Sequence, residues 1–170
     1  MCSIHRLSGC LALLVLSACA GYKLGPTNGL QADAKTIQIN PFPNQTIEPR
    51  LGDALAAAMR KSLQHDGTYR LSTHGNADVI VNGVITDYSR GGLSFVPNDV
   101  LTVRDFRVSA TVQVTARDAV SGKVLVDRRV TGYTLVRAGA DLTSAERQAL
   151  PLLAEDLARK ATALLVDGSW

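Results

Sequence analysis

The sequence predicts an α+β domain, a two-layer sandwich of two helices on a mostly antiparallel four-stranded sheet, in the order β-α-β-β-β-α. Residues 106–117 alternate between apolar and polar side chains, and residues 123–137 follow after a short turn, which indicates an antiparallel hairpin. Two other segments, 49–65 and 143–167, repeat apolar residues at helical spacing. Two helices with one apolar face each need a sheet to bury those faces.

The first expected elements are a strand at 36–40 and a helix that ends near His65. Polar and apolar residues alternate in the strand, and Pro41 ends it. Asp66-Gly67 ends the helix. Its apolar face repeats every four residues, at Leu51, Leu55, Met59 and Leu63.

The strand expected at 77–88 is apolar on both faces, which is typical of a central strand. Residues 68–72 fit a short additional strand, which is not one of the four strands of the predicted sheet. From Arg90 to Asp99, glycine, proline and asparagine predict a long loop. Its apolar residues, Leu93, Phe95 and Val96, indicate either a packed loop or a contact surface.

The hairpin that starts at Phe106 has two chemically different faces. Its even-numbered residues are apolar, so Val112 and Val114 are expected to lie buried under the helices. Its odd-numbered residues are polar, so Thr111 and Gln113 are expected to stay more exposed. The solvent side of the sheet should therefore be polar.

The last helix is expected to begin with a capping box, in which Thr143 and Glu146 satisfy the first backbone amides. Pro151 should kink its early turns, because proline lacks the amide that the helix ladder uses. Gly168 should end it.

The N-terminus is typical of a bacterial lipoprotein precursor. Arg6 precedes an apolar run, 11–16, that is too short to span a bilayer. Leu16-Ser17-Ala18-Cys19 matches the lipobox, and the alternative is an ordinary secretory signal with a chance cysteine. We expect a signal peptide at 1–18, a lipidated N-terminus and tether at 19–35, and one α+β domain at 36–170.

Cysteine usage agrees with a lipid anchor at Cys19. Cys2 and Cys10 lie in the expected leader, so the mature domain has no disulfide. A single acyl chain binds a membrane reversibly, and a further chain on the freed amine would make the anchor firm. Ala20 after the cysteine, rather than Asp, resembles lipoproteins that are sorted to the outer membrane.

The sequence offers no familiar catalytic constellation. His65 and His74 have no partner at metal-ligand spacing, and no nucleophile elbow, phosphate loop or dinucleotide motif occurs. Glu155 and Asp156 point different ways on a helix and are expected to be solvated. The net charge of +3 is too small to predict a nucleic-acid partner. We expect a binding protein with neither enzymatic activity nor a cofactor.

Arginines cluster around the expected loop and the hairpin. Their planar guanidinium groups suit phosphates, which makes them candidate contacts. The alternative is solubilising strand charge, partly paired with Asp105 and Asp127. The candidates are Arg90, Arg104, Arg107, Arg128, Arg129 and Arg137.

Nearly the whole expected mature chain resembles the lipopolysaccharide-assembly lipoproteins, the LptE family. The resemblance lies in soft patterns of apolar residues. They comprise the start Cys19-Ala20-Gly21-Tyr22-Lys23-Leu24, the segment 37–46, the helix 51–63, the hairpin from Phe106, and a late helix with Ala154, Leu157 and Leu164.

The resemblance implies two helices on a four-stranded sheet, and a large outer-membrane β-barrel as partner. The lipoprotein would help that barrel to fold and to pass lipopolysaccharide to the cell surface. It would be lipid-anchored in the outer membrane, with its domain on the periplasmic side or inside the barrel lumen. Basic residues of some members contact lipid phosphates, and the six arginines match them by residue type only.

The opening pattern, residues 36–63, also resembles other envelope lipoproteins. Some of these activate cell-wall synthases, and some serve transport systems. The chain beyond Phe106 and the Gly-Tyr-x-Leu start at Gly21 favour the first family.

The lipobox predicts that Cys19→Ser abolishes lipidation, because serine has no thiol to take the diacylglycerol. Mass spectrometry of the wild-type protein extracted from membranes should show a mature N-terminus at Cys19 with added acyl mass. An uncleaved, unmodified wild-type chain would contradict this expectation.

Overall fold

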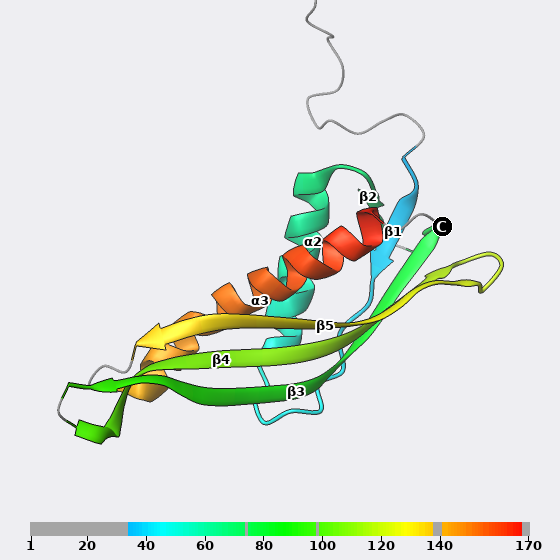
Figure 1. Cartoon of the computed structure of the whole chain (residues 1–170). Helices are drawn as coiled ribbons and strands as arrows, with labels where there is room; N and C mark the ends of the chain where they lie inside the picture. Colours follow the sequence, from blue (N-terminus) through cyan, green and yellow to red (C-terminus); the bar gives the residue numbers. More distant parts are fainter. Residues whose placement is uncertain (1–33, 74, 98, 138–140, 168–170) are drawn as a thin grey trace, which may run out of the picture.

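A computed structural model describes residues 34–73, 75–97, 99–137 and 141–167. In these residues the chain forms two helices and a mixed five-stranded sheet (Figure 1). The strands lie in the order β2-β1-β3-β4-β5. In chain order the elements are β1 (Thr36–Ile39), α2 (Leu51–Asp66), β2 (Arg70–Leu71), β3 (Val79–Val96), β4 (Asp99–Asp118), β5 (Val124–Arg137) and α3 (Leu142–Val166).

The α+β class is confirmed, but the expectation of a four-stranded, mostly antiparallel sheet is only partly right. The short strand at Arg70–Leu71 is a fifth strand, and β1 runs parallel to both β2 and β3. Parallel pairing follows from the connection, because α2 carries the chain from the end of β1 back to the start of β2. The strands β3, β4 and β5 are antiparallel, as expected.

The expected loop from Arg90 to Asp99 is wrong, because β3 continues to Val96 and β4 starts at Asp99. The glycines that predict a loop lie inside the paired strands, with Gly92 opposite Phe106. A Cβ on Gly92 would lie 3.1 Å from a methyl group of Val103. Glycine is therefore a close-approach residue in this strand, and the register shifts directly after it.

One face of the long strands forms the aliphatic core with both helices. Val112 and Val114 are fully buried, whereas Thr111 and Gln113 are partly exposed, which confirms the expected register. Leu153 and Leu157 of α3 are fully buried in the same core.

The predicted end of the first helix at Asp66-Gly67 is confirmed, whereas the start of that helix and the N-cap of the last helix differ from the predicted ones. Helix α2 begins at Leu51, and the amide of Gly67, at a φ of 78°, donates to the carbonyl of Leu63 at 3.1 Å. The N-cap of α3 is Asp141, whose carboxylate accepts from the amide of Thr143 at 3.0 Å, so the expected Thr143–Glu146 capping box is wrong. Helix α3 continues through Pro151 to Val166. Gly168 lies outside the described residues.

Helix α3 packs directly onto the edge strand β5 at Gly132. A Cβ there would lie 2.6 Å from Cγ of Leu157, so only glycine lets the helix approach this closely. The carboxylate of Asp156 accepts from the amide of Tyr133 at 3.1 Å, and Nζ of Lys160 donates to the carbonyl of Thr131 at 2.9 Å. Asp156 therefore binds the strand edge, which corrects the expectation of a solvated side chain, while Glu155 is exposed.

The register predicts that Val112→Asp destabilises the domain by about 3–5 kcal/mol, because an unpaired charge would be buried. Urea unfolding measures the change in free energy. Ser109→Asp is the matched control, since Ser109 lies on the opposite face of the same strand and should tolerate a charge. Equal losses for the two variants would show that the assigned faces are wrong.

Candidate partner-binding surface

The strands β3, β4 and β5 present a face that points away from both helices (Figure 1). We call it the outer face. Its polar character follows from the period-two alternation of the strands. Its residues include Ser89 of β3, Arg107, Ser109, Thr111, Gln113, Thr115 and Arg117 of β4, and Asp127, Arg129, Thr131, Tyr133 and Leu135 of β5.

Side chains on the outer face bond to one another across the strands. The hydroxyls of Thr111 and Thr131 lie 3.1 Å apart, and the amide of Gln113 donates to Asp127 at 2.6 Å. The hydroxyl of Thr115 also donates to Asp127, at 3.2 Å. These bonds form a polar surface on the long strands, which suits a partner that is itself polar.

A cationic and aromatic group stands at one end of this face. The guanidinium of Arg107 lies over the ring of Tyr133, 4.9 Å from its centroid, and Nζ of Lys160 approaches the same ring at 5.2 Å. Tyr133 is 50% exposed, and Leu135, directly opposite Arg107 in the register, is 60% exposed. Arg107 has no carboxylate within salt-bridge distance in the described part of the chain, so its charge is available to an anionic partner.

Arg104 and Arg137 meet at Asp105, at the same end of the sheet. Their Nε atoms donate to the Asp105 carboxylate at 3.0 and 3.2 Å, and the hydroxyl of Ser94 donates to it as well. The bonds from Ser94, Arg104 and Arg137 lower the pKa of Asp105 to about 2. Asp105 therefore stays ionised and partly neutralises the charges of both arginines. This agrees with the alternative from the sequence, in which these arginines are partly paired with Asp105.

Arg90 lies on the helix side of the sheet, opposite the buried Val108. It forms an ion pair with Glu146 of α3 at 2.6 Å and lies over the ring of Phe106. The Arg90 side chain therefore links β3 to α3. The sequence did not predict this contact, because it placed Arg90 in a loop and Glu146 in a capping box.

The remaining two candidates lie apart from the others along β5. The register places Arg128 opposite the buried Val114, and its guanidinium donates to the backbone carbonyl of Asp127. Arg129 lies on the outer face, opposite Gln113. The structure therefore brings Arg104, Arg107 and Arg137 together and separates them from Arg128 and Arg129.

Tyr133 was not among the residues singled out from the sequence. The signal that could have found it is its odd position in 123–137, which places a large aromatic ring on a face of threonines and charges. Leu93 and Phe95, both about half-exposed, are further apolar residues toward the tip of the β3–β4 hairpin.

In the residues that the structure describes, no three His, Cys, Asp or Glu side chains gather as metal ligands. His65 lies in the last turn of α2, and His74 lies outside the described residues. Neither described helix is long and apolar enough to cross a bilayer.

A family model described as LptE, lipopolysaccharide-assembly, matches residues 34–163. Among solved structures, a protein from Xanthomonas campestris is 9% identical with a TM-score of 0.62, covering 86% of this chain and 91% of that one. A hypothetical protein from Chlamydia trachomatis is 12% identical with a TM-score of 0.58, covering 79% and 96%.

A minor lipoprotein from Acinetobacter baumannii is 18% identical with a TM-score of 0.54, covering 79% of this chain and 94% of that one. At such identities the likeness shows the fold alone. No match was found among the curated proteins.

The Asp105 cluster predicts that Asp105→Asn reduces the acid sensitivity of the fold. An unfolded aspartate titrates near about pH 3.9, and the folded pKa is lower, so the ionised form stabilises the fold above about pH 4. That contribution is lost as the pH falls toward 2. Urea midpoints of wild type and variant should therefore converge between about pH 5 and pH 2, and a constant difference would show that Asp105 does not stabilise the fold through its charge.

Proposed function

The chain belongs to the lipopolysaccharide-assembly family LptE, and from this premise we propose what it binds and where it works. It is an outer-membrane lipoprotein, anchored through Cys19, that binds a β-barrel translocon and helps to assemble it. The barrel delivers lipopolysaccharide to the outer leaflet. Like the other members of its family, the chain acts in lipopolysaccharide assembly and is not an enzyme.

The outer face is the observation that carries this proposal. It is long, polar and uncovered by the helices, and its side chains already bond to one another. The lumen of a large outer-membrane barrel is polar, so a domain that enters it needs such a face. Tyr133 and Leu135 add half-exposed apolar area, which suits the anchor residues of an interface.

The arrangement of the two sheet ends supports the proposal further. Strand β1, which follows the expected tether, pairs with β3 at Val79, whereas Arg107 pairs with β3 at Gly91. At about 3.3 Å per residue, these two positions on β3 are roughly 40 Å apart. The arginine-bearing end therefore reaches away from the anchored end, into the lumen or toward the lipid that passes through it.

Arg107 is the best candidate for a lipopolysaccharide phosphate or a barrel carboxylate. Its guanidinium is oriented by Tyr133 and is not neutralised by a carboxylate in the described residues. Arg104 and Arg137 share Asp105, so their net contribution is smaller.

An envelope lipoprotein that activates a cell-wall synthase or serves a transport system is the second candidate. Its support is the strand-then-helix start at 36–63, which resembles such lipoproteins. The LptE family shares this start, so residues 36–63 do not separate the two candidates.

Depletion of the protein distinguishes the lipopolysaccharide-assembly function from the second candidate. We expect loss of assembled barrel, less surface lipopolysaccharide and greater sensitivity to hydrophobic antibiotics. Intact surface lipopolysaccharide with altered peptidoglycan would move the assignment to the second candidate.

Complementation of the depleted strain tests the role of Arg107. Arg107→Gln should weaken retention of the barrel or of lipopolysaccharide about tenfold, the effect of one exposed charge-assisted bond. Arg117→Gln is the matched control, because Arg117 lies at the other end of the same strand and also lacks an ion pair in the described residues. Equal retention by the two variants would remove Arg107 from the proposed contact.

A further inference from the structure

The edge of β3 that faces away from β4 has no partner strand over its C-terminal half (Figure 1). Strand β1 pairs with β3 as far as Val81, and the segment after β1 pairs with Ile85, whose amide donates to the carbonyl of Pro43 at 2.9 Å. From Asp87 to Val96, β3 pairs with β4 alone among the described residues. This stretch is therefore an open sheet edge.

The register shows which backbone groups point to the open side. The amide of Tyr133 and the carbonyl of Thr131 bond to α3, so these residues of β5 direct their backbone groups away from β4. Backbone direction alternates along antiparallel strands, so Ser109 and its odd-numbered neighbours in β4 bond to β3. The residues of β3 that lie between these bonded pairs, with their N–H and C=O groups on the open side, are Tyr88, Arg90 and Gly92.

The two edges of the long strands differ in how they are protected. Helix α3 satisfies the edge of β5 with the side chains of Asp156 and Lys160. On the edge of β3, residues 89–92 are exposed, and residues 87–92 include neither proline nor lysine, which natural sheets use to block strand addition. A Cβ on Gly91 would meet no atom within 4 Å, so there is open space beside this backbone.

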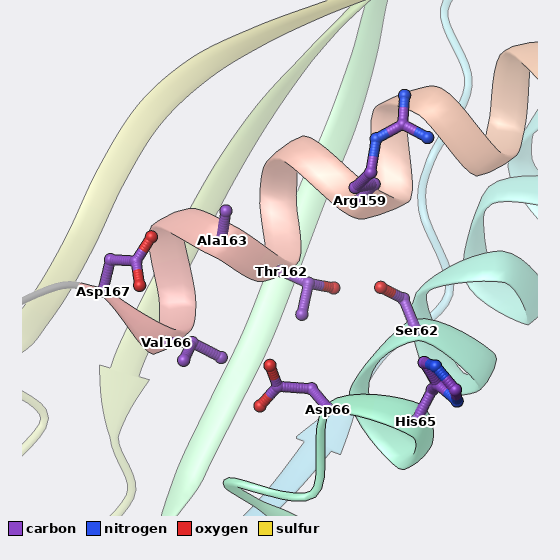
Figure 2. Close-up of a pocket in the computed structure, with 8 residues that line it drawn as sticks. All are labelled: Ser62, His65, Asp66, Arg159, Thr162, Ala163, Val166 and Asp167. Atoms are coloured by element: carbon purple, nitrogen blue, oxygen red, sulfur yellow. The ribbon is translucent and has the colours of Figure 1, made fainter.

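The groove between α2 and α3 offers no comparable site (Figure 2). The backbone groups of its helical walls bond within the helices. The hydroxyl of Thr162 lacks a hydrogen-bond partner in the described residues, but it also has almost no accessible surface through which a ligand could reach it. A partner that binds through its backbone would therefore meet the edge of β3 and not this groove.

We propose that the edge of β3 at residues 88–92 binds an extended segment of the barrel protein, which adds to the sheet as a further strand. The alternating N–H and C=O groups of the edge match the backbone of an extended peptide, which presents the same alternation. The segment is a loop or a terminus, because the strands of a closed barrel have their backbone groups paired already. This inference rests on the proposed function, since it takes the same partner.

A segment of another protein fits this edge better than a second copy of the chain. In a two-fold pairing centred on the open stretch, two copies of Arg90 would lie opposite each other, and like charges in that position destabilise a strand pair. The edge also adjoins Arg107 of the outer face, which pairs with Gly91 in the register and forms no ion pair with a described residue. An acidic residue of the added strand beside Gly91 would lie two strand spacings, roughly 10 Å, from Arg107 and would complement its charge.

Retention of the barrel by the lipoprotein, purified from outer membranes in detergent, tests the proposal. Arg90→Pro removes an N–H that the pairing with β4 does not use, and the proline ring blocks an approaching strand. Arg90→Ala is the matched control, because it loses the same ion pair with Glu146 but keeps the N–H. We expect Arg90→Pro to retain about tenfold less barrel than Arg90→Ala, the effect of a lost backbone bond together with the steric block.

Hydrogen exchange in the wild-type complex is a second measurement, and it decides alone if Arg90→Pro does not fold. The amides of Tyr88 and Arg90 should exchange about tenfold more slowly in the complex than in the free lipoprotein. The amides of Ser89 and Gly91 are the internal controls, because they bond to β4 in both states and should change little.

Three outcomes would overturn the proposal. Equal retention by a folded Arg90→Pro and by Arg90→Ala, or unchanged exchange of the Tyr88 and Arg90 amides, would exclude strand addition and leave the proposed function intact. Wild-type lipoprotein that retains no barrel would overturn the proposed function as well. A dimer of the purified lipoprotein that Arg90→Pro dissociates would assign the edge to a second copy.

Discussion

The contact between α3 and the middle of β5 is the constraint on which the rest of the structure depends. Leu157 packs where Gly132 has no side chain, and Asp156 and Lys160 bond to the two backbone groups on either side of it. Burial opposes the charge of Asp156, yet the bonds from Lys160 and from the amide of Tyr133 keep its pKa below the usual value. The edge of β5 is thereby satisfied by a helix rather than left open to another strand.

Three features follow from this contact. Both helices are committed to one side of the long strands, so the opposite face stays uncovered and polar. Tyr133 is held in place through its own amide, and its ring then supports Arg107 on the outer face and meets Lys160 at the edge. The path of α3 across the sheet also sets it beside α2, where their facing residues form the groove around Thr162.

Sequence patterns predicted what depends on local periodicity. The alternation in 106–117 gave the correct buried and exposed residues, and the repeat of Leu51, Leu55, Met59 and Leu63 predicted the buried face of α2. The errors concern residues whose role is set by distant partners. Gly91 and Gly92 indicate a loop by composition, but their neighbours across the hairpin make them strand residues. The parallel strand β2 is two residues long, which is too short to show an alternation of polar and apolar residues.

The sequence predicted the residue type of the candidate site, clustered arginines, but not which partners these arginines contact. Clustered arginines correctly drew attention to the end of the hairpin, yet their different roles depend on partners far away in sequence. Arg90 pairs with Glu146, while Arg104 and Arg137 share Asp105. Such pairs emerge only once the register of three strands is known. The same holds for Asp156. The sequence around it is typical of an exposed helix face, yet its carboxylate accepts from the backbone amide of Tyr133.

The central claim is that the outer face, and not the helix layer, meets the proposed barrel. Photo-crosslinking in living cells tests this most directly, with a photoreactive side chain placed at Ser109 or Thr115 on the outer face, or at Gln148 or Ala163 on α3. We expect the two outer-face positions to capture an outer-membrane barrel protein and the helix positions not to capture it. Capture of the barrel from the helix positions alone would contradict it.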